Sequence, residues 1–446
     1  MKVLLITHGS RGDVQPFAAL AKGLAEAGHT ATLAAPAASA WLGKPFCDRV
    51  LALHDGPNVL ADDTEVVKGL ESVFRGVSGK RRLLTTIPKT RRLVGAVQDD
   101  LASMAHEMAR NGGRDFDVVV HHVAGAGHDV AEFLGVPSVL MCPQPYWVPT
   151  GAFPDPSLPW PWPARFNRTS YFASRAVWWA FSGSSARWRR RSLGLGERPG
   201  GRYRQVNGQP TPVLHPFSQY LLPGPSDYPS WVHTTGFWFL PAADNWSPPA
   251  ALTSFLADGP PPIYLGFAST VSSDPKRLGR IVRNSARSAG VRAVVVGGWS
   301  GLTTADVGKD ILLLNDVPFD WLFRHVAAIV HHGGLGTTGA AMAAGVPQVV
   351  CPLLPDQWFS ARRMQTLGIA PAPVPQRALT ADALAQAIHA VLADPRTAAR
   401  AAAVGELVRD ENGVARAVDI LETVARSGRI AMDVNWPIFD AAGTEK

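Results

Sequence analysis

Cysteine is scarce in this chain of 446 residues, and the few that are present form no known pattern. Cys47, Cys142 and Cys351 are odd in number and have neither the spacing of a disulfide framework nor that of a zinc site. This usage predicts a reducing, cytoplasmic setting.

Long apolar runs are missing as well. No stretch of about 18 apolar residues occurs, so no membrane-spanning helix is expected. Arg11 and Asp13 interrupt the apolar segment near the N-terminus, which argues against a signal peptide.

Acidic residues are missing from two segments, 72–98 and 156–196, although both carry many arginines. Two solvated basic faces explain this composition most simply, and a peripheral contact with an anionic membrane is the alternative. No nucleic-acid-reading motif accompanies the charge, so no nucleic acid is expected as a partner.

Apolar strands and helical patterns alternate along both halves of the chain. Strands are expected at 3–7, 30–35, 118–121 and 138–142, and again at 262–267, 292–296, 311–314, 327–332 and 347–352. This alternation predicts an α/β protein with two doubly wound domains that face each other. The proline-rich stretch 223–250 is the expected linker between a domain at 1–222 and one at 251–425.

The first strand runs into a short polar segment that carries His8, Ser10, Arg11, Gly12 and Asp13, ahead of a helix expected to start at Pro16. Such strand-to-helix turns are where doubly wound proteins keep their chemistry. The segment offers no G-x-G-x-x-G, and no acid stands near Ala35, which argues against a dinucleotide-dependent oxidoreductase.

A second polar turn follows the strand at 327–332. His332 precedes a glycine-rich turn, after which Thr337 and Thr338 open a helix. Glycines let a ligand approach the backbone closely, and a helix N-terminus attracts anions, so this turn is a candidate phosphate site. A glycine-rich turn capped by threonine, with no ligand, is the alternative.

The segments HGSRGDVQPFAALAKGLAEAGH (8–29), PIYLGFASTVSSDP (262–275) and HHGGLGTTGAAMAAGVPQVVCPLLPDQ (331–357) resemble the nucleotide-sugar-dependent glycosyltransferases of the GT-B fold. The similarity is nearest to the sterol and lipid glucosyltransferases and to the actinomycete antibiotic glycosyltransferases. It implies an acceptor domain at 1–222, a donor domain at 251–425, and a tail at 426–446 that packs back on the first domain.

The resemblance also implies roles for single residues around a UDP- or dTDP-sugar, with no further cofactor. Asp356 and Gln357 would bind the sugar hydroxyls, and Trp299 and Val317 the base and ribose. In many plant members a glutamate grips the ribose where this chain has Ala340. The remaining donor contacts are His332, Gly334, Gly336, Thr337 and Thr338 at the diphosphate, Ser269 or Thr270 at a phosphate oxygen, and Ser10, Arg11 and Gly12 on the first turn.

Transfer to an alcohol needs a base for the acceptor proton. The resemblance assigns this role to Asp13, in an inverting displacement. His8 is the rival because an ordinary histidine pKa suits the task better, and an N-cap is the purely structural alternative for Asp13. His121, His122 and His128 could approach the acceptor or could be packing residues. No Asp-x-Asp pair or ligand-spaced histidine set predicts a metal site.

Aromatic residues are concentrated between 146 and 188. They could form core, or they could line an apolar pocket for a sterol-like, polyketide or aromatic alcohol. A GT-B-fold epimerase and a non-catalytic nucleotide-sugar or lipid binding protein are the competing functions. The candidate acceptor contacts are Tyr146, Trp147, Phe153, Phe172 and Trp179.

Overall fold

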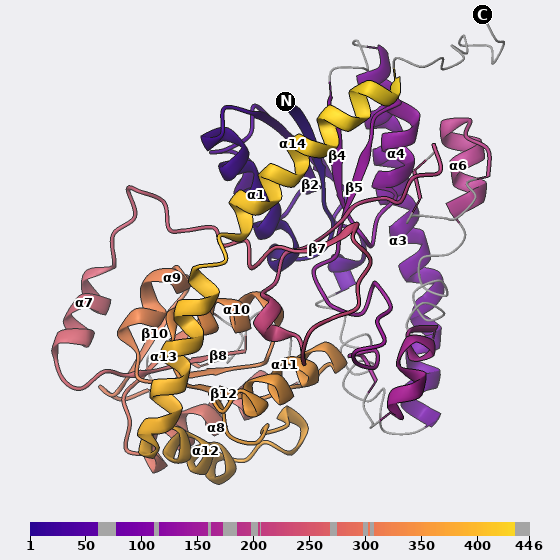
Figure 1. The fold of residues 1–446 in the computed structure, drawn as a ribbon. Coiled ribbons are helices and arrows are strands. Elements are labelled where there is room, and N and C mark those ends of the chain that lie inside the picture. The colour runs from indigo at the N-terminus through magenta and orange to yellow at the C-terminus, as the bar shows by residue number, and fades with distance from the viewer. Residues whose placement is uncertain are drawn as a thin grey trace, which may run out of the picture.

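The computed structural model consists of two α/β units, one above the other in Figure 1. Residues described are 1–60, 77–110, 116–158, 162–172, 185–197, 204–205, 207–267, 274–297, 302–303 and 307–432.

The first unit contains a seven-stranded parallel sheet with the order β3-β2-β1-β4-β5-β6-β7. Its strands are β1 (Lys2–Ile6), β2 (Thr30–Pro36), β3 (Arg49–Leu53), β4 (Val118–His122), β5 (Ser138–Met141), β6 (Val213–His215) and β7 (Val232–Thr234).

Helices cover both faces of this sheet because the side chains of β1 alternate between two cores. Val3 and Leu5 pack with α1 (Arg11–Glu26) and α14 (Gly413–Met432). Leu4 and Ile6 pack with α3 (Val77–Arg110), α4 (Gly127–Leu134) and α6 (Ser185–Leu193).

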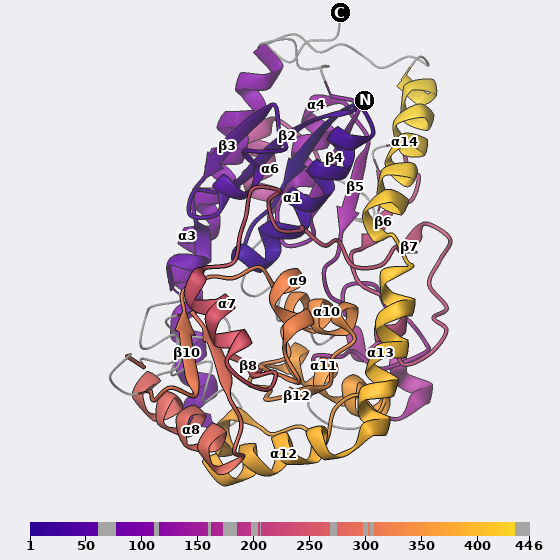
Figure 2. The same cartoon turned by 90° about the vertical axis from the view of Figure 1, so that its left-hand side faces the viewer.

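The second unit contains a five-stranded parallel sheet with the order β10-β9-β8-β11-β12. Its strands are β8 (Ile263–Gly266), β9 (Ala293–Val296), β10 (Ile311–Leu314), β11 (Ile329–His331) and β12 (Gln348–Val350). Around it lie α7 (Ala250–Ala257), α8 (Pro275–Ser288), α9 (Phe319–Leu322), α10 (Leu335–Ala344), α11 (Pro355–Thr366), α12 (Ala381–Ala393) and α13 (Pro395–Arg409) (Figure 2). Single 3₁₀ turns occupy Ala40–Gly43, Gly56–Leu60, Ala164–Phe166, Gln219–Leu221, Phe323–His325 and Gln376–Ala378.

The expected α/β class with two parallel sheets is confirmed, but three strands are unexpected. β6 and β7 are three residues long and carry polar residues, so the sequence shows no long apolar run there. β3 does contain an apolar run at 50–53, although most of its residues are only partly buried. The expectation of a linker across all of 223–250 is wrong, since β7 pairs with β6 as the edge of the first sheet.

The start expected for the first helix, Pro16, is also wrong. The helix α1 begins at Arg11 with Ser10 as its N-cap, and Asp13 reaches back to accept the Ser10 backbone N–H at 2.8 Å. Pro16 therefore lies inside the helix, where it cannot donate the i→i−4 hydrogen bond to the Gly12 carbonyl.

The chain returns to the first unit earlier than the expected tail at 426–446. In both views α14 starts near the second unit and runs up along the first (Figures 1 and 2). Val414 packs where a Cβ on Gly23 of α1 would lie, and His29 Nε2 meets Glu422 Oε1 at 2.9 Å. Residues 433–446 of the expected tail lie outside the described chain.

A shared apolar cluster joins the two units. It combines Phe153, Phe217 and Phe237 of the first unit with Met342 and Met364 of the second. Arg363 of α11 reinforces the junction, because its guanidinium donates to the carbonyls of Leu221 at 2.9 Å and Tyr220 at 3.2 Å. In the described part of the chain, no helix is long and apolar enough to cross a membrane.

Gly413, at the start of α14, offers a test of this junction. A Cβ there would lie 2.6 Å from the backbone of Gly236 and Phe237. We expect Gly413→Ala to destabilise the protein by about 1–3 kcal/mol through overpacking, seen as a lower Tm. Gly95→Ala is the control, because Gly95 lies in α3 with no atom within 4 Å of an added Cβ and a helical Gly→Ala change stabilises by about 0.5–1 kcal/mol. Equal Tm changes in both variants would contradict a tight junction.

Candidate functional site

Two loops that carry polar side chains follow the central strands of the two sheets. The strand order reverses beside β1 in the first sheet and beside β8 in the second, and ligands bind at such reversals in doubly wound folds. The first loop leads from β1 into α1, and the second leads from β11, the neighbour of β8, into α10.

Asp13 lies in the first turn of α1 and is partly buried, with a side chain that is 28% exposed. Its Oδ2 accepts the backbone N–H of Ser10 at 2.8 Å and the Ser10 hydroxyl at 3.2 Å. Burial raises the pKa of Asp13 to about 6, although the Ser10 hydrogen bonds act in the opposite direction. Gly9 has a φ of +96°, and a Cβ there would lie 2.3 Å from the carboxylate, so this approach requires glycine.

His8 is partly buried in the same loop. Its ring fills the space where a Cβ on Gly125 would lie, and its Nε2 has no hydrogen-bond partner within the described chain. Burial, with a further contribution from His122, lowers the pKa of His8 to about 3. Burial therefore makes His8 a weaker base and Asp13 a stronger one.

His122 approaches Asp13 from the end of β4. Its Nε2 lies 3.9 Å from Asp13 Oδ1, and its Nδ1 accepts the backbone N–H of Ala124 at 3.0 Å. The neighbouring His121 instead packs against the ring of His128, at 5.7 Å between ring centres. The sequence pointed to all three histidines without indicating which one would reach the loop.

The second loop separates the roles of two adjacent histidines. His331 is structural: its Nε2 pairs with Gln348 Oε1 at 2.9 Å, and its Nδ1 accepts the N–H of Gly333. His332 is 7% exposed, and its Nδ1 has no partner among the described residues. A Cβ on Gly334 would lie 2.3 Å from its Nε2, so the ring needs a glycine at the start of α10.

His332 is neutral, because burial and the nearby His331 lower its pKa to about 3. The first turn of α10 has open space beside the exposed Gly336. Thr337 is buried, and the Thr338 hydroxyl donates to the Gly334 carbonyl at 3.0 Å within the helix. The unpaired N–H groups of this turn and His332 are therefore its main donors toward an anion.

Asp356 and Gln357 lie in the first turn of α11. The Oε1 atom of Gln357 accepts the N–H groups of Leu353 and Leu354 at 2.8 and 3.0 Å, so half of its amide caps the helix. Burial raises the pKa of Asp356, and the charge of Asp13 on the other unit adds to this effect.

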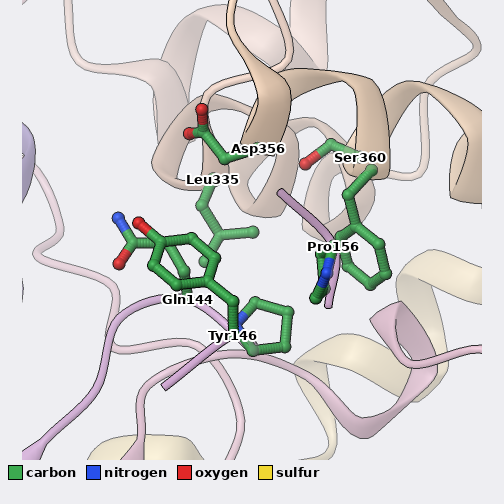
Figure 3. A pocket seen from close by; sticks show the side chains of 8 residues that line it. Gln144, Tyr146, Pro156, Leu335, Asp356 and Ser360 are labelled. Carbon is green, nitrogen blue, oxygen red and sulfur yellow. The ribbon is translucent and has the colours of Figure 1, made fainter. Parts of the chain in front are cut away.

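A pocket between the two units is lined by residues from both of them, Asp356 included (Figure 3). Asp356 and Ser360 enter it from α11, while Gln144 and Tyr146 enter from the loop after β5. Burial and the nearby Asp356 and Asp13 raise the pKa of Tyr146 well above its usual range, so it remains a neutral phenol. The sequence did not indicate Gln144 or Ser360, whose buried Oγ has no partner within the described chain.

Two expected donor contacts are engaged elsewhere. Arg11 points to the second unit, where it pairs with Asp316 at 3.2 Å. Both side chains are more than half exposed, so this pair contributes little stability. Val317 is 1% exposed and packs in the core, which leaves its backbone to meet a ligand. Gly12 is exposed in the first turn of α1.

The expected acceptor residues occupy different environments. Trp147 packs against Tyr146 and donates from Nε1 to Gln144 Oε1 at 3.1 Å. Phe153 is buried against Phe359 of α11, at 6.2 Å between ring centres. Phe172 is 76% exposed, so it lies on the surface instead of in a closed pocket. Ser269, Thr270, Trp299 and Trp179 lie outside the described residues.

Part of the second unit matches a known family. Residues 293–418 match the family described as erythromycin biosynthesis protein CIII-like, C-terminal domain. A sterol 3-beta-glucosyltransferase of Emericella nidulans is 33% identical over 94% of this chain, which covers 30% of that relative. The Arabidopsis thaliana sterol 3-beta-glucosyltransferase is 31% identical, and the match covers 94% of this chain and 67% of that relative. The chain thus spans about a third of the length of the fungal relatives.

Solved structures share the fold at lower identity. The glycotransferase of kitacinnamycin superposes with a TM-score of 0.64 at 18% identity, over 95% of this chain and 99% of that one. The glycosyltransferase VinC, solved in complex with dTDP, gives a TM-score of 0.64 at 19% identity, over 96% of this chain and 100% of VinC.

The raised pKa of Asp13 predicts that its ionisation destabilises the fold. The folded protein holds this proton up to about pH 6, whereas an unfolded aspartate loses it near ~3.9. The protonated side chain of Asp13 therefore leaves the fold at its full stability at low pH. This stability is lost as the pH rises through about 6, where Asp13 ionises in the folded protein. We expect Asp13→Asn to match the wild-type Tm near pH 4 and to exceed it at pH 7, by at most about 3 kcal/mol of unfolding free energy.

Asp227→Asn is a control of opposite sign. Hydrogen bonds from Thr150, Gly151 and Arg168 lower the pKa of Asp227 to about 2, so its charge stabilises the fold at neutral pH. Its variant should lose Tm relative to wild type above pH 4. A pH-independent Tm difference for Asp13→Asn would contradict the buried, high-pKa carboxyl.

Proposed function

This chain belongs to the GT-B glycosyltransferase family, and on that premise we propose that it transfers a hexose from a UDP- or dTDP-sugar to a hydroxyl of a hydrophobic acceptor. The observation that carries the proposal is the meeting of Asp13 with Asp356 and Tyr146 across the two units. Tyr146 and Asp356 line one pocket between the units, and the charge of Asp13 is near enough to raise the pKa of both.

The donor diphosphate would bind at the N-terminus of α10. Its oxygens would accept the free N–H groups of the first turn, and neutral His332 would donate one further N–H. In this arrangement the N-terminus of α10 and His332, instead of a metal ion, would stabilise the negative charge of the leaving diphosphate. Asp356 and the free NH₂ of Gln357 would hold sugar hydroxyls, and discrimination between sugars would follow from these buried polar groups.

Asp13 would take the acceptor proton. As it does so, the acceptor oxygen forms a bond to the anomeric carbon, and the bond from that carbon to the diphosphate oxygen breaks with its electron pair. Attack opposite the leaving group inverts the configuration. Asp13 is favoured over His8 because burial shifts their pKa values in opposite directions, to about 6 and about 3.

The acceptor would enter beside Tyr146, Trp147 and Phe153. The naming of the curated relatives as sterol 3-beta-glucosyltransferases favours a sterol-like 3β-hydroxyl and a glucosyl donor. Aromatic side chains suit a rigid, apolar ring system.

A substrate screen with three proteins tests this function. Wild type, Asp13→Asn and His8→Asn are each incubated with UDP- and dTDP-hexoses and with sterols or phenolic alcohols, and the products are read by mass spectrometry. We expect wild type and His8→Asn to form glycosides, and Asp13→Asn to lose at least about a hundredfold in rate. Activity in Asp13→Asn but not in His8→Asn would move the base to His8.

Other outcomes of the same screen would overturn the transferase assignment. Conversion of the donor into an epimeric nucleotide sugar without any acceptor would identify an epimerase. Tight nucleotide binding with no turnover on any acceptor would identify a binding protein.

Calorimetry with UDP and dTDP tests the diphosphate site separately. We expect His332→Ala to weaken binding about tenfold to a hundredfold, because a hydrogen bond to a charged group contributes about 1.5–3 kcal/mol. His325→Ala is the matched control, an exposed histidine of the same unit whose Nδ1 hydrogen-bonds to the Trp321 carbonyl. Equal affinities in the two variants would place the diphosphate elsewhere.

A further inference from the structure

We propose that His122 is a positioning residue that holds the carboxylate of Asp13 in the orientation needed to take the acceptor proton. This inference rests on the proposed role of Asp13 as the base. His122 comes from a different strand than the loop that carries Asp13. The experiment below distinguishes failure of the role of His122 from failure of the role of Asp13.

The parallel sheet places His122 beside the first loop. β1 and β4 are neighbours, with Ile6 in register with His121, so both strands end at the same edge. His122 is therefore the last residue of β4, directly next to the segment that carries His8 and Asp13. Its side chain is 8% exposed, and its Nε2 lies 3.9 Å from Asp13 Oδ1.

The backbone fixes which nitrogen of His122 carries a proton. Nδ1 accepts the N–H of Ala124 at 3.0 Å, and a ring nitrogen that accepts a hydrogen bond carries no hydrogen of its own. The proton therefore lies on Nε2, the nitrogen on the Asp13 side. An N–H in this place favours a negative charge on Oδ1.

The two oxygens of Asp13 then have different surroundings. Oδ2 is held by the backbone N–H and the hydroxyl of Ser10. Oδ1 faces His122 at a distance longer than a hydrogen bond, which leaves it able to accept the acceptor hydroxyl. Ser10 thus holds one oxygen by hydrogen bonds, and the nearby N–H of His122 acts electrostatically on the other. A defined orientation of the base is what proton transfer requires.

Other charged and titratable groups face this carboxylate and must be included in any pH argument. Asp356, across the pocket, disfavours a second negative charge. Tyr146 is a neutral phenol, and His8 is neutral because of its burial. Among these groups on the described chain, His122 and Ser10 are the ones that direct a donor toward Asp13.

The test compares two substitutions at this position. His122→Phe keeps a planar ring but removes Nε2–H, and we expect kcat to fall about tenfold to a hundredfold, with the acidic limb of the pH–rate profile moved to higher pH. The calorimetric affinity for UDP or dTDP should stay at the wild-type value. His122→Gln places an amide N–H at a similar reach, and it should recover most of kcat and return the limb toward wild type.

His121→Gln is the matched control, a histidine on the same strand that packs against His128 on the other side. It should leave the pH profile unchanged, and Tm values check folding of every variant. The inference is overturned if His122→Phe keeps the wild-type kcat and pH limb, or if His122→Gln is as impaired as His122→Phe. If Asp13→Asn is itself active, the assignment of Asp13 as the base fails. If Asp13→Asn is inactive but His122→Phe keeps the kcat and pH profile of the wild type, only the role of His122 fails.

Discussion

The apolar contact between the two units is the constraint on which the site depends. Asp13 and His122 belong to the first unit, while His332 and Asp356 belong to the second. No local interaction brings these groups together. Their proximity results from the shared cluster around Phe153 and Met364 and from the return of α14 to the first unit. Burial of apolar surface thus holds apart and aligns two polar loops that would otherwise be independent.

Burial also sets the chemistry of each group at the site. The same desolvation that raises the pKa of Asp13 lowers that of His8 and His332, because it always disfavours the charged form. The carboxylate becomes a better base near neutral pH, and the histidines become neutral donors. The position of the site between the units therefore sets the pKa values of its groups. Ionising Asp13 costs free energy, and the stability of the rest of the fold offsets that cost.

Much of the fold could be predicted from the sequence, since central parallel strands are buried on both faces and must be apolar. The strands from β1 to β12 that met this condition were placed within a residue or two. The short strands β6 and β7 were missed, because pairing with a neighbour and not their own composition makes them strands. The start of α1 was misplaced because Pro16 suggested a first turn, whereas the hydrogen bond between Ser10 and Asp13 begins the helix earlier.

The sequence by itself determined which loops are the candidates for chemistry, because a glycine-rich turn after an apolar strand is a local pattern that needs no partner. It indicated His332 and Asp13 in this way, as well as the two-domain class. Only the tertiary structure decided which of the paired histidines are structural, that Tyr146 lies near both Asp13 and Asp356, and that His122 approaches the carboxylate. These relations join residues far apart in the chain, and their distances are set by sheet order and domain packing, which no local pattern encodes.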